Sequence, residues 1–453
     1  MTGSGAGGLF EAAALGPVQL RNRIVKAATF EGMSWHGVVS DALIDFHRAF
    51  AAGGVGMTTL AYCAVSPDGR GAPNEIVLGR QTLPGLARLA EAVHAEGAAI
   101  SAQIGHAGPV ARRRVAGSRA LAASSGFSQL GTRYRAMTAA DIARVTRDFA
   151  AAARMLADAG FDAAELHMGH HYLLNSFLSP KFNRRSDSWG GSLQNRARFP
   201  REVARAVRDS VGDRLAVTAK LEMADGVPGG LWLDESIELA RLLEADGTLD
   251  ALQLTAGGSL ANPMFLFHGD VPRKEFAATL PRALRLGFRL AGRRLLREYP
   301  FHEAYFRPWA RQFLAALSIP LILVGGITRR DTMTQAVSEG FAFVAMGRAL
   351  LREPDLVARL RRGDATESLC VHCNKCIPTI YRGTHCVLVP PADRPGLRLV
   401  RETGRVDVKP GLPLRRGILG RRRRPAPGGC RLRPGAGPAS QRPRRHGVRR
   451  FWG

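Results

Sequence analysis

The sequence lacks a hydrophobic run long enough to cross a membrane. No stretch approaches the roughly 18 consecutive apolar residues that a spanning helix needs. The first residues, MTGSGAGGLFEAAALGP, also lack the basic segment and the apolar core of a secretory signal peptide. Cysteine is scarce as well: 6 among 453 residues do not make a disulfide scaffold. We therefore expect a cytoplasmic protein with no membrane partner.

Acidic residues are few relative to basic ones, and the imbalance is concentrated at one end. The formal net charge is +26, and residues 391–453 contribute 18 Lys and Arg against 3 Asp and Glu. This Arg/Pro/Gly-rich tail has no apolar period, so it predicts disorder. Three interpretations of this tail remain open. It is a solvated run of charge without a function, a segment that binds nucleic acid, or, after about Arg398, an out-of-frame or otherwise non-homologous translation product. Nucleic acid is the unlikely partner, because the only aromatic residues for base stacking are Phe451 and Trp452.

The rest of the chain has an ordinary globular composition, with 45% hydrophobic and 23% charged residues, which excludes collagen, coiled coil and wholesale disorder. Short apolar runs alternate with longer segments of helical period, which predicts an α/β fold. Two helices are clear, Leu83–Glu96 and Ala140–Ala159, the second with Thr138 as its N-cap. Eight runs suggest a (β/α)8 TIM barrel over residues 9–365, with an insertion at about 262–315 that could cover its mouth. The predicted strands are Arg23–Ala28, Met57–Ala61, Ala99–Gln103, Ala163–His167, Ala216–Leu221, Ala251–Thr255, Pro320–Val324 and Phe343–Met346.

Polar residues and glycines follow the predicted strands, where active sites of such barrels lie. Glycines after strands seven and eight let backbone N–H groups approach an anion, and Arg348 adds a planar cation suited to phosphate. The alternative is that these glycines only turn the chain. We predict a phosphate site there. The strand ends carry Gln103, His167, Lys220, Gly325, Gly326, Gly347 and Arg348.

Six segments together resemble successive signatures of the Old Yellow Enzyme family of FMN-dependent oxidoreductases (NADH:flavin oxidoreductases). They are LRNRIVKAATFEG, AQIGHAG, GFDAAELHMGHHYLLNSFLSPKFNRRSDSWGGSLQNRARF, VTAKLE, VGGIT and MGRALL. The chain is nearest the 2,4-dienoyl-CoA reductase and trimethylamine dehydrogenase branch, but lacks its second nucleotide-binding domain. The resemblance implies an FMN-containing barrel that takes hydride from NAD(P)H and passes it from flavin N5 to an electron-poor small molecule.

The same resemblance implies which residues hold FMN. Gln103 matches the glutamine that binds the flavin pyrimidine, although it could instead satisfy the barrel backbone. Lys220 matches the cation near flavin N1 and O2, with a salt bridge to Glu165 or Glu222 as the alternative. The backbone of Ala28 and Thr29 is expected to border the ring, and Gly325, Gly326, Gly347 and Arg348 to hold the phosphate. The sequence departs from the family at Phe30, where many relatives have Thr or Cys beside flavin O4.

His167, His170 and Tyr172 match the catalytic set. In relatives, the two histidines hydrogen-bond a substrate carbonyl, on which charge develops, and the tyrosine protonates the α-carbon. These matches imply reduction of the C=C bond of an α,β-unsaturated carbonyl compound. The alternatives are an amine or N-methyl dehydrogenase of the trimethylamine dehydrogenase type and, in a different class, a nucleic-acid-binding protein acting through its tail.

Four cysteines, Cys370, Cys373, Cys376 and Cys386, crowd into the segment 366–390 directly after the barrel. In a reducing compartment such a cluster indicates metal rather than disulfides. Iron–sulfur, zinc and no metal all remain open. The larger relatives hold a [4Fe-4S] cluster with a similar motif, although the last spacing is shorter here. Electrons would reach FMN directly from NAD(P)H or from a separate electron-donor protein.

Overall fold

The computed structural model describes residues 8–111, 113–128, 132–280 and 282–397. Eight parallel strands form one closed barrel, because the last strand pairs with the first and the first pairs with the second. All eight predicted strands are confirmed, with ends shifted by at most three residues. They are β3 (Ile24–Lys26), β4 (Met57–Ala64), β6 (Ala99–Gly105), β10 (Ala163–Met168), β11 (Ala216–Glu222), β12 (Ala251–Thr255), β13 (Leu321–Val324) and β14 (Phe343–Met346).

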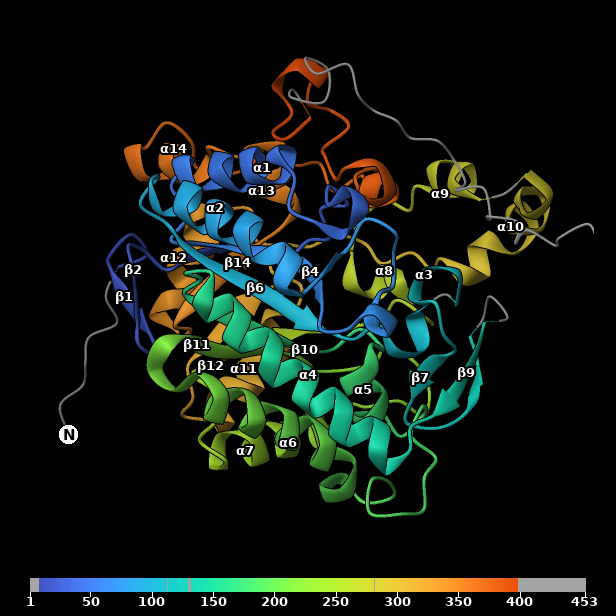
Figure 1. The fold of residues 1–453 in the computed structure, drawn as a ribbon. Helices are drawn as coiled ribbons and strands as arrows, with labels where there is room; N and C mark the ends of the chain where they lie inside the picture. The colour runs from blue at the N-terminus through green and yellow to red at the C-terminus, as the bar shows by residue number, and fades with distance from the viewer. Residues whose placement is uncertain (1–7, 112, 129–131, 281, 398–453) are drawn as a thin grey trace, which may run out of the picture. The chain divides into compact units, whose positions relative to one another are not determined.

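Helices surround the barrel (Figure 1). Most of them connect one strand to the next, while α13 and α14 follow the last strand. Both predicted helices are present. The first, α2, buries Leu86, Leu89 and Val93, and the second, α4, begins at a capping box between Thr138 and Asp141. The surrounding helices are α1 (Asp41–Ala52), α2 (Leu83–His94), α4 (Ala139–Asp158), α6 (Leu193–Val211), α7 (Leu233–Ala245), α11 (Arg307–Ala316), α12 (Arg330–Ser338), α13 (Arg348–Arg352) and α14 (Leu356–Arg362).

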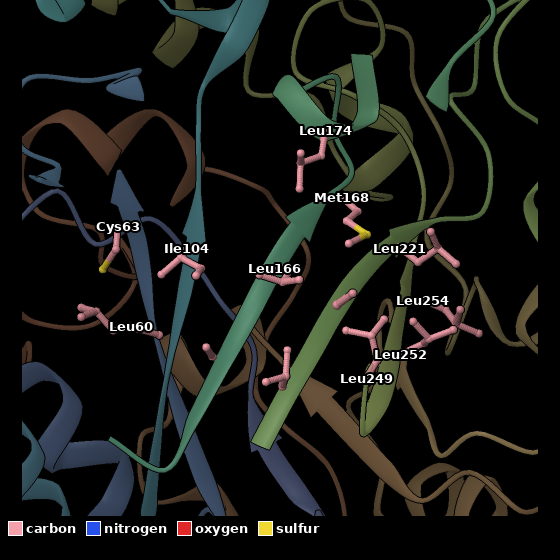
Figure 2. Close-up of a cluster of buried hydrophobic side chains, with 14 of the residues drawn as sticks. Leu60, Cys63, Ile104, Leu166, Met168, Leu174, Leu221, Leu249, Leu252 and Leu254 are labelled. Carbon is pink, nitrogen blue, oxygen red and sulfur yellow. The ribbon is translucent and has the colours of Figure 1, made fainter. Parts of the chain in front are cut away.

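Alternation along the strands decides which side chains face the barrel interior. Leu166 and Met168 of β10 belong to the apolar cluster between strands and helices (Figure 2). Because successive side chains point to opposite faces, Glu165 and His167 point inward. The opposite, N-terminal end of the barrel is closed by the hairpin β1 (Ala13–Leu15) and β2 (Val18–Leu20), whose leucines pack with the first residues of the strands. Gln103, Glu165, His167 and Lys220 therefore point inward toward the C-terminal end.

Smaller elements extend the C-terminal end of the barrel. Three short helices after β12 form part of the predicted insertion, and the cysteine segment follows α14. No helix within the described ranges is long and apolar enough to span a membrane. The predicted disorder of the tail falls on residues 398–453, which lie outside the described residues, whereas 391–397 are described. The smaller elements are β5 (Ile76–Val77), α3 (Arg113–Ala116), β7 (Ala120–Ala122), β8 (Gly126–Phe127), β9 (Arg133–Ala136), α5 (Leu173–Leu178), α8 (Pro263–Leu266), α9 (Arg273–Thr279), α10 (Arg282–Leu295) and the 3-10 helices η6 (Ile377–Arg382) and η7 (Pro391–Asp393).

Candidate active site

One cavity of about 540 Å³ opens at the C-terminal ends of the strands. This volume lies in the range of small-molecule and cofactor sites. The structure brings all eleven predicted catalytic and cofactor-binding residues to its wall, together with Phe30. They are Ala28, Thr29, Gln103, His167, His170, Tyr172, Lys220, Gly325, Gly326, Gly347 and Arg348.

A buried carboxylate organises the floor of this cavity. Glu165 Oε1 accepts from Gln103 Nε2 at 2.7 Å and from Lys220 Nζ at 3.0 Å, while its Oε2 accepts from Gln253 Nε2 at 2.6 Å. The salt bridge that the sequence left as an alternative for Lys220 is therefore present, and Lys220 still borders the cavity. Because the Nε2 of Gln103 is held by Glu165, its Oε1 is the atom left for a ligand.

The two histidines lie side by side at the end of β10, with ring centroids 5.0 Å apart. Gly169 N donates to Nδ1 of His167 at 3.4 Å, so Nε2 of this ring carries the proton. Nε2 of His170 pairs with Thr255 Oγ1 at 2.9 Å, which leaves its Nδ1. Burial lowers the pKa of both rings, and the positive charge of Lys220 lowers it further. Both imidazoles are therefore neutral near pH 7.

Tyr172 packs against His167, with ring centroids 4.5 Å apart, and against Tyr62, at 5.4 Å. Burial raises the pKa of its phenol, and the nearby carboxyl of Glu75 raises it further. Its O–H therefore stays protonated near neutral pH, which a proton donor requires. His171, to which the sequence assigned no role, lies outside the cavity wall, buried against Phe182.

Backbone conformation shapes the predicted phosphate end. Gly325 and Gly326 have φ of +118° and +68°, and a Cβ on either would stand 2.5 Å from the ring of Phe306 or Tyr305. Only glycine fits such positions. Arg348 Nη1 donates to His268 O at 2.8 Å and to Asn374 Oδ1, and its Nη2 donates to the Tyr305 hydroxyl at 3.3 Å. The guanidinium thus borders the cavity while it also ties the insertion to the cysteine segment.

The four cysteines surround a second, small cavity of about 20 Å³, next to Arg348 and Asn374. All four thiols are free and half-buried. Burial raises the pKa of Cys376 to about 12, while the charge of Arg348 acts in the opposite direction. Within the described ranges, no three His, Cys, Asp or Glu side chains lie close enough to hold a single metal ion. Cys376 borders both cavities.

Sequence reasoning missed several residues of the wall. Tyr62 stands near the end of β4, and the rule that strand ends carry site residues could have found it. Glu75 lies in the connection between β4 and α2, where no periodicity marks it. Tyr381 and Thr384 belong to the cysteine segment and also line the cavity. This segment is therefore part of the active-site wall.

The residues present fit a phosphorylated flavin. The cavity wall offers an amide oxygen and an ammonium group, from Gln103 and Lys220, together with glycine backbone and the guanidinium of Arg348. Thr29 Oγ1 is buried without a hydrogen-bond partner in this structure. A polar atom of this kind is normally satisfied, so it is consistent with a ligand that supplies the missing bond.

The fold and the site define a barrel oxidoreductase, and comparison with known proteins identifies the group. Residues 8–253 match the NADH:flavin oxidoreductase / NADH oxidase family. The chain belongs to this family, and it is an FMN-dependent oxidoreductase. The family implies FMN and NAD(P)H as its cofactors and a small molecule as its substrate.

Individual relatives agree with this assignment. The chain is 53% identical to the 4,4'-dithiodibutanoate disulfide reductase of Rhodococcus erythropolis over 390 residues, which are 86% of this chain and 96% of that protein. It is 32% identical to the NADH oxidase of Thermoanaerobacter brockii over 400 residues, 86% of this chain but 57% of that protein. Several other relatives are also about twice as long as the matched part.

Solved structures show the same barrel. A 2-naphthoyl-CoA reductase complex superposes with a TM-score of 0.73 at 25% identity, covering 85% of this chain and 57% of that one. Morphinone reductase superposes with a TM-score of 0.62 at 25% identity, covering 81% of this chain and 92% of that one.

Proposed function

We propose that this protein reduces the activated C=C bond of α,β-unsaturated carbonyl compounds with NAD(P)H as reductant. The observation that carries this proposal is the position of His167, His170 and Tyr172 on the same cavity wall as Gln103 and Lys220. When bound, FMN accepts hydride from NAD(P)H and delivers it to the electron-poor carbon.

The protein's own groups bind and polarise the substrate. His167 donates through Nε2–H to the substrate carbonyl, and His170 through its free Nδ1 side, so that both stabilise the charge that develops on oxygen. Tyr172 gives its phenolic proton to the α-carbon. Gln103 and Lys220 bind the flavin ring, Ala28 and Thr29 border it, and Gly325, Gly326, Gly347 and Arg348 hold the phosphate.

The replacement Tyr172→Phe tests the proposal. We expect reduction of the flavin by NADH to persist, because Tyr172 is not needed for that step, while reoxidation by 2-cyclohexenone slows by about 100-fold, the usual contribution of a general acid. Stopped-flow absorbance at the flavin band measures both half-reactions. Equal loss of both would refute Tyr172 as the proton donor, and wild-type protein that reduces no enone would refute alkene reduction.

Reduction of an organic disulfide is the second candidate, and the 53% identical relative is the observation that favours it. Cleavage of R–S–S–R consumes two electrons and two protons and releases two thiols. The discriminating assays follow NADH consumption with 2-cyclohexenone and with 4,4'-dithiodibutanoate, and, for the amine dehydrogenase alternative, reduction of an artificial electron acceptor by trimethylamine without NADH. The substrate with the highest kcat/KM identifies the reaction.

We also propose that Cys370, Cys373, Cys376 and Cys386 hold a [4Fe-4S] cluster. The observations that support this proposal are that the four thiols surround one small cavity and that four thiolates are the usual ligands of such a cluster. A cluster would accept and pass single electrons. Iron and acid-labile sulfide near four atoms each per chain would support it; their absence from anaerobically purified protein would refute it.

The remaining proposals concern organisation. We assign the barrel to residues 9–365 with the insertion at about 262–315, and the cysteine segment to 366–390. We propose direct reduction by NAD(P)H rather than delivery by a separate electron-donor protein, and a cytoplasmic location. Steady NADH oxidation by the purified chain with an added acceptor tests the direct route.

A further inference from the structure

Glu75 is a buried carboxyl group in the wall of the active-site cavity, and the proposed reaction has not used it. Its exposed fraction is 4%, yet it borders the cavity together with Tyr62 and Tyr172. Gly71 N donates to its Oε2 at 2.6 Å. None of the described cations lies within salt-bridge distance of it. The structure therefore holds a carboxyl group beside two phenols without a cation to fix its charge.

The groups facing Glu75 come from three elements. Arg70 belongs to its own loop, but donates to the carbonyl of Pro73. Tyr62 and Cys63 lie on β4, and Tyr172 lies before α5. The Tyr62 hydroxyl donates to Gly69 O at 3.2 Å, which anchors the same loop to β4. Tyr381 of η6 lines the same cavity and also raises the pKa of Tyr172.

The charge of Glu75 acts on these neighbours. It raises the pKa of Tyr62 and of Tyr172, and its own burial raises the pKa of Glu75 to about 8. The carboxyl is therefore a neutral acid near pH 7. The phenol of Tyr172 holds its proton far more strongly than Glu75 does, so a proton moves favourably from Glu75 to a tyrosinate.

We propose that Glu75 is the internal proton source that reprotonates Tyr172 after each reduction. The inference rests on the proposed alkene reduction. Tyr172 gives its proton to the α-carbon as hydride reaches the β-carbon. The O–H bond of Glu75 then breaks as a new O–H bond forms on Tyr172, with the proton passing through a water molecule of the cavity that both side chains line. Glu75 is left as a carboxylate, which takes a proton from water once the product leaves. Electrons and protons balance, because the substrate gains one hydride and one proton.

The test compares wild type with Glu75→Gln and with Glu75→Asp, which keeps an acid. Glu91→Gln, on the exposed face of α2, is the matched control. Steady-state kcat with NADH and 2-cyclohexenone is measured from pH 6 to pH 10, and flavin reduction by NADH is measured alone. Infrared difference spectra of each variant during pH titration follow the carbonyl stretch of a protonated carboxylic acid.

We expect kcat of the Gln variant to fall by about tenfold. This loss is smaller than the roughly 100-fold loss expected when a direct general acid is removed. Flavin reduction by NADH should change less than twofold. Wild-type kcat should fall above about pH 8 and the Gln variant should lose that break; the Asp variant should keep part of the rate. Because burial also raises the pKa of Glu222 and Asp225, the Glu75 band is taken from the difference between the wild-type and Gln-variant titrations, where a carboxylic-acid band should titrate near the same pH. An unchanged rate and profile in the Gln variant, or a difference that holds no such band, would overturn the inference. Wild-type protein that binds flavin but reduces no enone would instead count against the proposed function, and the infrared titration would still assign Glu75.

Discussion

The orientation of Gln103 depends on one residue, Glu165. The carboxylate accepts from Gln103 Nε2 and also compensates the charge of Lys220. A glutamine amide can be reversed, so its direction has to be fixed by its partners. Because Glu165 accepts only, it keeps the Gln103 carbonyl oxygen toward the cavity. The charged partner therefore selects the hydrogen bonds that are offered to a flavin.

We expect Glu165→Gln to weaken FMN binding by about tenfold, or about 1.4 kcal/mol, because Gln103 can then present either end of its amide. It should also raise the flavin reduction potential, since Lys220 loses its compensating charge and favours the anionic reduced ring. Fluorescence titration of the apoprotein with FMN and a dye-coupled redox titration measure the two effects. Glu202→Gln on α6 is the control, and unchanged affinity and potential in Glu165→Gln would contradict the role.

Glu75 also predicts how stability depends on pH. Its pKa rises from an ordinary 4.5 to about 8 on folding, so the folded state keeps a proton that the unfolded state has lost. Its contribution to stability is full below about pH 4.5 and is lost as pH rises toward 8. The free energy of unfolding of the Glu75→Gln variant should therefore increase relative to that of wild type as the pH rises through this window. At about 1.4 kcal/mol per pKa unit, the difference should reach several kcal/mol. Urea unfolding at a series of pH values measures the difference; a gap that stays constant with pH would contradict it.

The eight strands could be predicted because each is a short apolar run. Active sites of such barrels lie at the C-terminal ends of the strands, and this rule then identified Gln103, His167 and Lys220 as site residues. The residues that the sequence did not reveal depend on tertiary contact. Glu75 lies in an irregular loop, and its place beside Tyr172 depends on how that loop packs against β4. The hydrogen bonds of Arg348 also arise from segments far apart in sequence, since Asn374 and His268 both reach it only in the folded chain.

The cysteine segment acts as an element of the active site rather than as an appendage. Asn374, 1% exposed, donates to Phe267 O at 2.9 Å and to Asp270 O at 3.0 Å, and accepts from Arg348. Thr384 N donates to Glu31 O at 2.7 Å, beside Phe30 on the cavity wall. The segment thus connects the insertion, Arg348 at the cavity wall and the loop after β3.

Asn374→Ala should release Arg348 and remove the amide donor from two partly buried carbonyl groups, those of Phe267 and Asp270. Each lost hydrogen bond costs about 0.5–1.5 kcal/mol, so we expect a lower unfolding temperature and an FMN dissociation constant raised by about tenfold. Thermal unfolding followed by flavin fluorescence reports both. Asn195→Ala, which removes an amide on α6 away from the cavity, should leave FMN binding unchanged. Equal effects of the two replacements would show that Asn374 acts only through general stability.

Across the whole chain, the basic charge and the active site occupy different parts of the sequence. Every residue that lines the two cavities lies between Ala27 and Leu388, whereas residues 391–453 carry 18 basic residues against 3 acidic ones. Charge at that density attracts nucleic acid through counterion release, with an affinity that falls steeply as salt rises. Catalysis and any binding through the basic residues should therefore be separable.

A chain ending at Leu397 should keep its FMN and its NADH-dependent turnover of 2-cyclohexenone within about twofold of the full chain, because no cavity-lining residue is removed. It should lose any retention on a heparin column at low salt that the full chain shows, since the removed residues carry most of the excess charge. Flavin content, kcat and the salt concentration of elution are the three measurements. Loss of flavin on truncation would mean that residues after 397 contribute to the active site, and unchanged retention would place the basic surface on the barrel instead.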